Sequence, residues 1–346
     1  LCCTGGADLR EERARLAAGC GLVVGTPGRL RDHIERGALS SAEIGAVVVD
    51  EADDMLDLGF REDLERLIDA AGPERQTLMF SATLSARAEA LAARFQREAA
   101  RIVAPRPEGG APVAVRFEGV AVGHGEREAA VVNLLRFHEP QRAIVFCATR
   151  RAVASLAERL AARGFRVAAL SGALTHAERG AALCAFRSGR VQTCVATDLA
   201  ARGLDVPGLD LVIHADLPAS GAALLHRSGR TGRGGLGGRV VLVVSPAQRR
   251  RAESLLRRAG LDYVFGPAPD RAAILARDEG RLCAETGAAP QPAPEERAAA
   301  ARLIARHGAE TVAVAYLRGH LRARPAPEAF GVRTAGPGAR FADGVW

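Results

Sequence analysis

The stretch Val47-Val48-Val49-Asp50-Glu51-Ala52-Asp53 places three acidic residues directly after a run of three valines. Consecutive β-branched apolar residues predict a strand that is buried on both faces, as in a parallel sheet. In open α/β sheets, ligands bind at the carboxyl ends of the strands, which is where these acids would lie. There, one carboxylate can hold a Mg²⁺ bound to nucleotide phosphates, and its neighbour can act as general base on a water. Acids in this place are equally typical of the N-cap of a following helix, so both interpretations stay open at this point.

On either side of this stretch, short apolar runs of β type alternate with segments of helical period up to about residue 260. This alternation is typical of parallel sheets covered by helices, and it divides into two α/β units. In the first unit the predicted strands are Leu22–Val24, Val47–Val49 and Thr77–Phe80, with helices near Ala7–Ala18, Gly28–Arg36 and Arg61–Ala70. In the second unit the predicted strands are Ala143–Cys147, Arg166–Leu170, Gln192–Ala196, Leu209–His214 and Arg239–Val244, with helices that include Arg151–Arg163 and Thr175–Ser188.

The domain boundaries follow from changes in composition. Pro105–Gly110 combines prolines, glycines and charge, which is typical of a linker. We therefore predict a first domain at residues 1–104, a linker at 105–118, a second domain at 119–265 and a tail at 266–346. Within the tail, Glu295–Arg306 and Glu310–Arg322 predict a helical hairpin around His307-Gly308.

The composition is that of a globular protein with a basic excess: 346 residues, 48% of them hydrophobic, and a formal net charge of +7. That charge is compatible with a polyanionic partner without requiring one. The seven cysteines show no zinc-binding spacing, and several lie in apolar runs, which favours a reduced, cytoplasmic protein. No apolar run approaches the roughly 18 residues of a membrane span, and no secretory leader is evident, so we expect no membrane partner.

Lysine is absent from the chain. The phosphate-binding loop of nucleoside triphosphatases needs a lysine after its glycine-rich turn to reach the β- and γ-phosphates. A coding bias toward arginine explains a lysine-free surface, but it does not replace a catalytic lysine, so this sequence contains no such loop. The chain begins at Leu1 rather than at methionine, and we interpret it as a fragment of a longer protein.

Two further motifs in the first unit follow predicted strands. Ser81-Ala82-Thr83 provides two hydroxyls that can relay hydrogen bonds between an acid and a second domain. Thr26-Pro27-Gly28-Arg29 combines a hydroxyl, exposed backbone N–H groups and a guanidinium, which together suit a phosphate. Taken alone, a helix N-cap and an ordinary Pro-Gly turn are the more common interpretations of these two motifs.

The second unit carries two polar stretches, Thr197–Asp205 after a predicted strand and His226–Arg233 after a predicted helix. In the latter stretch Arg227, Arg230 and Arg233 recur at every third position among glycines. This pattern suits a triphosphate or a row of acids, because guanidinium binds phosphate in a bidentate way. A solvated basic loop is the competing interpretation.

Taken in order, the motifs TPGR (26–29), DEAD (50–53), SAT (81–83), TDLAARGLD (197–205) and HRSGRTGR (226–233) resemble those of the bacterial DEAD-box ATP-dependent RNA helicases of superfamily 2. Each motif is short, but their joint order and spacing are specific. The resemblance covers about residues 5–265. It implies an α/β fold of two RecA-like parallel-sheet domains, the first incomplete, followed by a helical tail. It also implies ATP and Mg as cofactors and RNA as the partner.

For the nucleotide, the resemblance assigns Mg²⁺ binding through water to Asp50 and activation of the attacking water to Glu51. Arg230 and Arg233 would be the arginine fingers on the γ-phosphate. Asp205 would contact the ribose.

For the other roles, the resemblance assigns two further sets of residues. The interdomain coupling set is Ser81, Thr83, His226 and Arg227, of which His226 also belongs to the catalytic set. The RNA-binding set is Thr26, Gly28 and Arg29 in the first domain, and Arg179 and Thr197 in the second.

Contacts to phosphates and 2′-hydroxyls imply a preference for RNA over DNA with weak sequence preference. The function implied is local unwinding or remodelling of RNA, in which ATP hydrolysis is coupled to closure of two domains. The RNA is not identified, and ribosomal RNA or a ribonucleoprotein is one candidate. An RNA-binding or scaffold relative without ATPase activity is the alternative, although a scaffold needs neither a general base nor paired fingers. A DNA helicase is disfavoured by the combination of DEAD and SAT.

The sequence also departs from the family pattern. The upstream half of the first domain, with its adenine-reading glutamine motif and phosphate-binding loop, is missing. A sheet without those strands would expose an unpaired edge and apolar faces, so we expect this chain to bind ATP poorly and its first unit to be marginally stable. His176 stands where many relatives have glutamine, and Asp54 where a basic residue or Glu is common. Phe341–Trp346 resembles the first strand of an RNA-recognition-like module.

Overall fold

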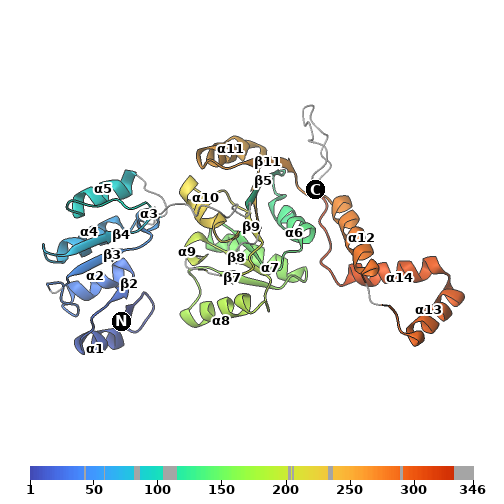
Figure 1. The fold of residues 1–346 in the computed structure, drawn as a ribbon, viewed down its shortest axis with the longest axis horizontal. Coiled ribbons are helices and arrows are strands. Elements are labelled where there is room, and N and C mark those ends of the chain that lie inside the picture. The colour runs from blue at the N-terminus through green and yellow to red at the C-terminus, as the bar shows by residue number, and fades with distance from the viewer. Residues whose placement is uncertain are drawn as a thin grey trace. The chain divides into compact units, whose positions relative to one another are not determined.

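Two structural units divide the chain, Leu1–Glu108 and Gly109–Trp346, and each alternates strands with helices (Figure 1). The structure is a computed structural model that describes residues 1–42, 44–57, 59–81, 86–103, 115–201, 204, 206–232, 237–288 and 291–330.

The first unit contains two pairs of parallel strands. Strand β1 (Cys2–Cys3) pairs with β2 (Val24–Gly25), and β3 (Ala46–Val49) pairs with β4 (Gln76–Met79). Strands β3 and β4 are found within one residue of their predicted bounds, β2 shares only Val24 with the predicted Leu22–Val24, and β1 was not predicted. The helices of this unit are α1 (Leu9–Ala17), α2 (Pro27–Glu35), α3 (Ala52–Asp57), α4 (Arg61–Ala70) and α5 (Ala86–Phe95).

Only one face of the β3–β4 pair is covered by the described residues. Val49 is buried in a cluster with side chains of α3, α4 and α5, such as Ile68 and Leu91. Neighbouring residues of a strand point to opposite faces, and on the other face Val48 is 58% exposed and Phe80 55% exposed. The pattern of a strand buried on both faces therefore does not hold at Val48, where no described helix covers the sheet, and this agrees with the exposed apolar face expected of the incomplete first unit.

The second unit is built on a seven-stranded parallel sheet with the strand order β11-β5-β10-β9-β6-β8-β7. Its strands are β5 (Val115–Ala121), β6 (Ala143–Phe146), β7 (Val167–Leu170), β8 (Thr193–Ala196), β9 (Leu211–His214), β10 (Gly238–Val244) and β11 (Tyr263–Pro267). Its helices are α6 (Arg127–His138), α7 (Arg150–Ala162), α8 (His176–Arg187), α9 (Asp198–Ala201), α10 (Gly221–Ser228), α11 (Arg249–Arg258), α12 (Arg271–Gly287), α13 (Pro294–His307) and α14 (Ala309–Arg322).

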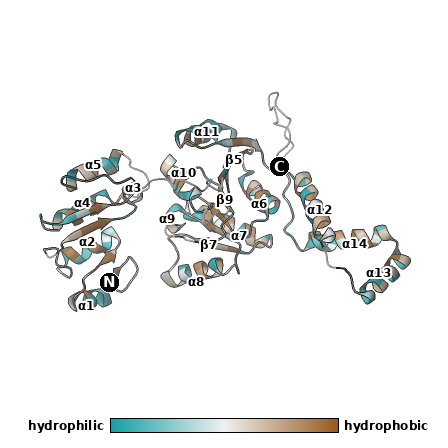
Figure 2. Cartoon of the chain, in the orientation of Figure 1, coloured by the Kyte–Doolittle hydropathy of each residue, from teal (hydrophilic) through white to brown (hydrophobic). Residues whose placement is uncertain are grey.

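Alternation along the central strands explains why this sheet is covered on both faces. In β6, Ala143 and Val145 belong to a core cluster with α6 and α7. Ile144 and Phe146 belong to a second cluster with α8, α9, α10 and α11. Side chains in a strand point to alternate faces, so a strand that is apolar at every position needs helices on both sides. In Figure 2 much of the ribbon at the centre of this unit has the brown colour of hydrophobic residues.

Two strands of this sheet were not predicted, β5 and β11. Strand β11 is at one edge of the sheet, where it pairs only with β5 among the described strands, and β5 lies between β11 and β10. In β5 charged residues and a glycine interrupt the apolar positions, and in β11 only three residues precede Gly266-Pro267, so neither shows the longer apolar run of a buried strand. Because β5 begins at Val115, residues 115–118 belong to the second sheet, and the predicted linker extends too far.

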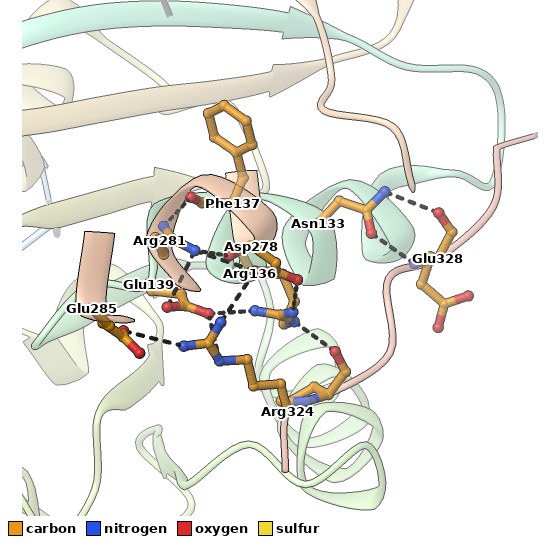
Figure 3. A network of polar contacts seen from close by, with 10 residues as sticks. Asn133, Arg136, Phe137, Glu139, Asp278, Arg281, Glu285, Arg324 and Glu328 are labelled. Carbon is orange, nitrogen blue, oxygen red and sulfur yellow. Dashed lines mark hydrogen bonds and ion pairs between the residues drawn. The ribbon is translucent and has the colours of Figure 1, made fainter. Parts of the chain in front are cut away.

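The tail folds back onto α6 (Figure 3). Arg136 of α6 and Asp278 of α12 form an ion pair of 2.7 Å, and both side chains are almost fully buried. Arg324 lies 3.4 Å from Asp278 and 3.4 Å from Glu139. Separating such a pair would leave a charge buried alone, which is costly. The cluster therefore holds α12 in one position on α6.

Residues 323–330 form a strap over the same helix. The Asn133 side-chain amide donates to the backbone carbonyl of Glu328 at 3.0 Å, and its oxygen accepts the Glu328 N–H at 2.7 Å. Arg136 Nε donates to the carbonyl of Pro325 at 2.6 Å. The chain on both sides of the α13–α14 hairpin is thereby attached to the second unit.

The predicted helical hairpin is confirmed as α13 and α14, which contact each other and contain no buried residue. Among the residues that the structure describes, no helix combines the length and apolar character needed to cross a membrane. Phe341–Trp346, the predicted strand of an RNA-recognition-like module, lies outside the described residues.

We expect the chain to unfold in two transitions, the first unit at the lower temperature, because its β3–β4 face is exposed. Leu242→Ala removes a fully buried side chain from the centre of the second sheet. It should lower the free energy of unfolding of the second transition by about 2–5 kcal/mol and leave the first unchanged. The control Leu78→Ala, at a 37% exposed position of β4, should leave the second transition in place. Differential scanning calorimetry checks both, and a single transition that moves with either variant would contradict the expectation.

Candidate functional site

The acidic loop of the first unit follows β3 directly. Its geometry is set by two backbone bonds to the end of β4: Phe80 N–H donates to Val49 O at 2.8 Å, and Ala52 N–H donates to Phe80 O at 3.0 Å. Ala52 is fully buried, whereas Asp50 and Glu51 are exposed. The strand end thus holds the chain on both sides of two carboxylates that face solvent.

Glu51 has a φ of +50°, in the left-handed region that side chains other than glycine rarely adopt. The Glu51 N–H donates to Asp50 Oδ1 at 2.9 Å, which supports this turn. Such a conformation costs of order 1–3 kcal/mol, and among the described residues other than glycine Glu98 and Glu139 also adopt it. The acids therefore form a loop of their own, rather than serving only as a helix cap.

The hydroxyl motif SAT is described only in part. Ser81 directly follows the strand end that bonds to the acidic loop and is partly buried. Thr83 lies outside the described residues.

The TPGR motif forms the turn between β2 and α2. Thr26 is the N-cap of α2 and is exposed, with its N–H bonded to Cys3 O at 3.1 Å. The preceding residue must be glycine, because a Cβ on Gly25 would lie 2.5 Å from the Cys3 carbonyl oxygen. Gly28 has more room, since a Cβ there would lie 3.7 Å from an Asp63 oxygen.

The Arg29 side chain points back to the loop that follows β1. Its guanidinium donates to the carbonyls of Thr4 at 3.1 Å and Ala7 at 2.6 Å. Glu12 Oε2 lies 3.2 Å from Arg29 Nε and 2.7 Å from His33 Nε2, with Glu12 and His33 both buried. Sequence reasoning missed Glu12 and His33, because neither stands in a recognisable motif. They hold Arg29 beside the loop at residues 4–7.

In the second unit, Arg179 and Thr197 come together at the end of β8. Arg179 reaches from α8 to donate to the carbonyl of Ala200 at 2.8 Å. The Thr197 carbonyl accepts the Ala200 N–H at 3.1 Å and so begins α9. The two predicted RNA-binding residues therefore lie on adjoining segments.

Arg227 crosses the ends of three strands from its position on α10. Its Nη2 donates to Asp198 Oδ2 at 2.7 Å, next to Thr197, and its Nη1 donates to the Asp216 carbonyl at 2.8 Å. The guanidinium lies 5.0 Å from the ring centroid of Phe146, the last residue of β6. The Arg227 side chain is only 4% exposed. Arg227 therefore acts inside the second unit, and sequence reasoning missed its partner Asp198.

His214, at the end of β9, completes this cluster. Its Nδ1 lies 3.3 Å from Arg227 Nη1. Complete burial, with the charge of Arg227 beside it, holds the pKa of His214 well below its ordinary range. A neutral imidazole can accept from Arg227, so the cluster carries the charge pair of Arg227 and Asp198 and no further charge from His214.

Arg230 links the two polar stretches a second time, because its Nη1 donates to the carbonyl of Leu204 at 3.2 Å. His226 is partly buried on α10. At Gly232 the φ is +72°, and a Cβ would lie 2.4 Å from Val115 Cγ2, so only glycine fits. Arg233 and Asp205 lie outside the described residues.

The site residues thus fall into two groups, one for each unit. Exposed acids, a hydroxyl and the TPGR turn follow strands of the first unit, and arginines gather at the carboxyl ends of strands in the second. Ligands of parallel α/β units bind at the carboxyl ends of the strands, and the motifs that supply these groups resemble those of two-domain, RecA-like helicases.

Comparison with known proteins identifies the family within this class. Residues 1–91 match the family profile "DEAD/DEAH box helicase", and residues 126–235 match "Helicase conserved C-terminal domain". Together the two profiles account for more than half of the chain. The chain belongs to the DEAD-box helicase family.

Curated relatives agree with this assignment. The chain is 39% identical over 270 residues to "DEAD-box ATP-dependent RNA helicase 9" of Oryza sativa subsp. japonica, covering 77% of this chain and 43% of that protein. It is 36% identical over 270 residues to "DEAD-box ATP-dependent RNA helicase CshA" of Bacillus subtilis, covering 78% of this chain and 54% of that protein. The chain spans about half the length of the curated relatives that it matches.

Solved structures share the fold. A structure of Dbp5 from S. cerevisiae, described as bound to RNA and ADP BeF3, aligns with a TM-score of 0.68 at 24% identity. The alignment covers 80% of this chain and 73% of that one. This similarity establishes the fold of two RecA-like domains.

Removing either partner of the Arg227–Asp198 pair should destabilise the second unit, but unequally. Asp198→Asn leaves the guanidinium of Arg227 buried without a countercharge, which should cost about 3 kcal/mol of unfolding free energy. Arg227→Met leaves a carboxylate that is 44% exposed and can be hydrated, so the cost should be only about 1–2 kcal/mol. Urea unfolding of the second transition measures both. If Arg227→Met lowers the free energy of unfolding more than Asp198→Asn does, the unpaired buried charge of Arg227 is not the largest cost and the expectation is wrong.

Proposed function

We propose that the protein to which this chain belongs is an ATP-dependent RNA helicase that locally unwinds or remodels RNA by closing two domains on nucleotide. The observation that carries this proposal is the exposed pair Asp50 and Glu51, held after β3 with Glu51 in the left-handed region. A scaffold protein has no need for two solvent-facing carboxylates in a strained turn. The relatives' names and the Dbp5 complex with RNA and ADP BeF3 support the same activity.

The acidic loop suits a nucleotide-bound Mg²⁺. Asp50 uses one carboxylate oxygen for the Glu51 N–H, and within the described residues its other oxygen accepts no hydrogen bond. Carboxylate oxygens are the ligands that Mg²⁺ prefers, and the ion would neutralise charge on the phosphates. In the proposed mechanism Asp50 holds the ion through water, and Glu51 accepts the proton of the attacking water.

The arginines of the second unit supply positive charge for the transferred phosphoryl group. Arg230 and Arg233 are proposed as arginine fingers on the γ-phosphate, and Asp205 as a contact to the ribose. Ser81, Thr83 and His226 are proposed to couple the two domains. The burial of Arg227 favours an indirect part in that coupling, through the residues that it holds in place.

RNA binding is proposed for Thr26, Gly28 and Arg29 of the first unit and for Arg179 and Thr197 of the second. Thr26 is exposed at the N-terminus of α2, where backbone N–H groups favour an anion. Such contacts read the sugar-phosphate backbone, so we expect weak sequence preference. Ribosomal RNA or a ribonucleoprotein remains the proposed target class.

By itself this chain should bind ATP weakly, because it has no lysine and hence no phosphate-binding loop of the usual type. A reduced, cytoplasmic location is proposed from the sequence, in which several cysteines stand in apolar runs as small buried thiols do.

Replacing Glu51 separates catalysis from binding. In the full-length protein, Glu51→Gln should abolish RNA-stimulated ATP hydrolysis because no base accepts the proton, while ATP-dependent RNA binding persists. A phosphate-release assay and RNA anisotropy measure the two activities. Glu62→Gln, at an exposed position of α4, is the matched control. Normal ATP turnover by the Glu51 variant would show that Glu51 is not the base. If the unsubstituted protein shows no detectable ATP turnover, the result favours an RNA-binding relative without ATPase activity.

Replacing Arg230 tests the proposed finger. Arg230→Ala in the full-length protein should slow hydrolysis on the order of a thousandfold, because the charge developing on the γ-phosphate loses its guanidinium. Single-turnover hydrolysis measures the effect without interference from product release. Arg166→Ala, at an exposed position before β7, serves as the control. A loss smaller than about tenfold would exclude a finger role.

A further inference from the structure

Helix α11 carries a concentration of positive charge that the proposed function does not use. Five of its residues are arginines, Arg249, Arg250, Arg251, Arg257 and Arg258, and its one acid is Glu253. The helix belongs to the second unit and lies outside all of the helicase motifs. Figure 2 shows it as a largely hydrophilic helix.

The inner side of α11 is firmly packed. Ala252 and Leu256 are fully buried in the core cluster that also contains β10. Arg249 pairs with Glu253 at 2.9 Å and lies over the ring of Phe265 in β11, 5.0 Å from its centroid. The one acid of the helix is thus already paired, and the helix is anchored independently of its other four arginines.

Those four arginines, Arg250, Arg251, Arg257 and Arg258, form the face that we call the α11 basic face. All four are exposed, and within the described part of the chain none of them forms an ion pair with an acid. Arg257 makes only a long contact of 3.5 Å to the carbonyl of Glu253. Some helical arginines elsewhere pair with an acid one turn away, as in Arg15–Glu11 and Arg36–Asp32. Others, such as Arg151 and Arg302, are unpaired within the described residues and are spread over different helices instead of being grouped on one.

Helical geometry groups these arginines into two rows. Arg250 and Arg257 are seven residues apart, as are Arg251 and Arg258, so each row spans two turns, or about 10 Å. No two of these four arginines stand three or four residues apart, so they are separate charges and not closely repelling pairs. A bias toward arginine explains why lysine is absent, but it does not explain why acids are missing from this face. Exposed guanidinium groups in two rows can each meet a phosphate of a polyanion laid along the helix.

We propose that the α11 basic face binds the sugar-phosphate backbone of RNA, as a contact additional to those of the helicase motifs. The choice of RNA rests on the proposed function, while the charge complementarity rests on α11 itself. Guanidinium groups bind phosphate in bidentate fashion and without reading bases. The contact therefore adds affinity for RNA of any sequence.

The position of α11 determines which RNA can reach it. Helix α11 packs on β10 and, through Arg249, on β11, whereas Arg179 and Thr197 lie at β7 and β8. Strands β9 and β6 lie between these two parts of the sheet. At about 4.8 Å between neighbouring strands, the two positions are roughly 15–20 Å apart. RNA bound at Arg179 and Thr197 must extend well beyond them to contact the α11 basic face.

The experiment compares binding of two single-stranded RNAs of mixed sequence, about 6 and about 25 nucleotides long, to the whole chain without ATP. In the test variant the four arginines of the α11 basic face are changed to glutamine. Fluorescence anisotropy at several salt concentrations should show about tenfold weaker binding of the long RNA and unchanged binding of the short one. The slope of log affinity against log salt should fall by about 3, because four phosphate contacts are lost.

The matched control removes the same charge elsewhere in the second unit. It changes Arg151, Arg166, Arg302 and Arg322 to glutamine, all of which are exposed and lie on different segments. This variant should keep tight binding of the long RNA. If both variants lose the same affinity for the long RNA, the effect depends only on net charge and the proposal is overturned. Unchanged affinity of the α11 variant for the long RNA would also overturn it. Melting temperatures close to that of the unsubstituted chain establish that both variants are folded.

A membrane surface is the competing partner for a basic helix face, and phosphatidylserine vesicles test it. If α11-dependent binding is found with these vesicles but not with RNA, the partner is a membrane surface and the proposal is wrong. Because the RNA assay contains no ATP, it does not depend on catalysis. If the unsubstituted full-length protein shows no ATPase activity, only the proposed function is overturned. If it shows RNA-stimulated ATPase activity and the α11 variant binds the long RNA normally, only the role of α11 is overturned.

Discussion

Burial of both faces of a parallel sheet is the constraint on which the second unit depends. Strands such as β6 are apolar at every position, so each residue must find a helix on one side of the sheet or the other. Helices α6 and α7 cover one face, and α8 to α11 cover the other. With both faces closed, the carboxyl ends of the strands are where polar side chains can gather, and the arginines of the site lie there.

Within that frame, Arg227 connects regions with different proposed tasks. Its guanidinium joins α10, which carries His226, to Asp198 beside Thr197, across the ring of Phe146. A buried guanidinium in contact with a carboxylate, a carbonyl and a neutral imidazole has few alternative arrangements, because moving it would leave its charge buried without a partner. The proposed nucleotide and RNA contacts of this unit are therefore held in one mutual arrangement.

The tail is attached by the same kind of interaction. Arg136 and Asp278 bury opposite charges between α6 and α12, and Asn133 fastens the strap that follows α14. Opposite charges far apart in the chain are brought together by tertiary packing, and their separation would be penalised. The second unit thus includes part of what composition alone marks as a tail, while the α13–α14 hairpin remains without buried residues.

The sequence by itself determined the parallel α/β class, most strands, the hairpin of α13 and α14, and the family, because these depend on local periodicity and on motifs of contiguous residues. It did not identify β5, in which charged residues interrupt the apolar positions, or β11, the edge strand that pairs with β5, whereas the exposure of Val48 agrees with the exposed apolar face expected of an incomplete first sheet. The tertiary structure alone decided the left-handed conformation of Glu51 and the pairing of Arg227 with Asp198. Each depends on contacts between segments distant in sequence, which no local pattern encodes.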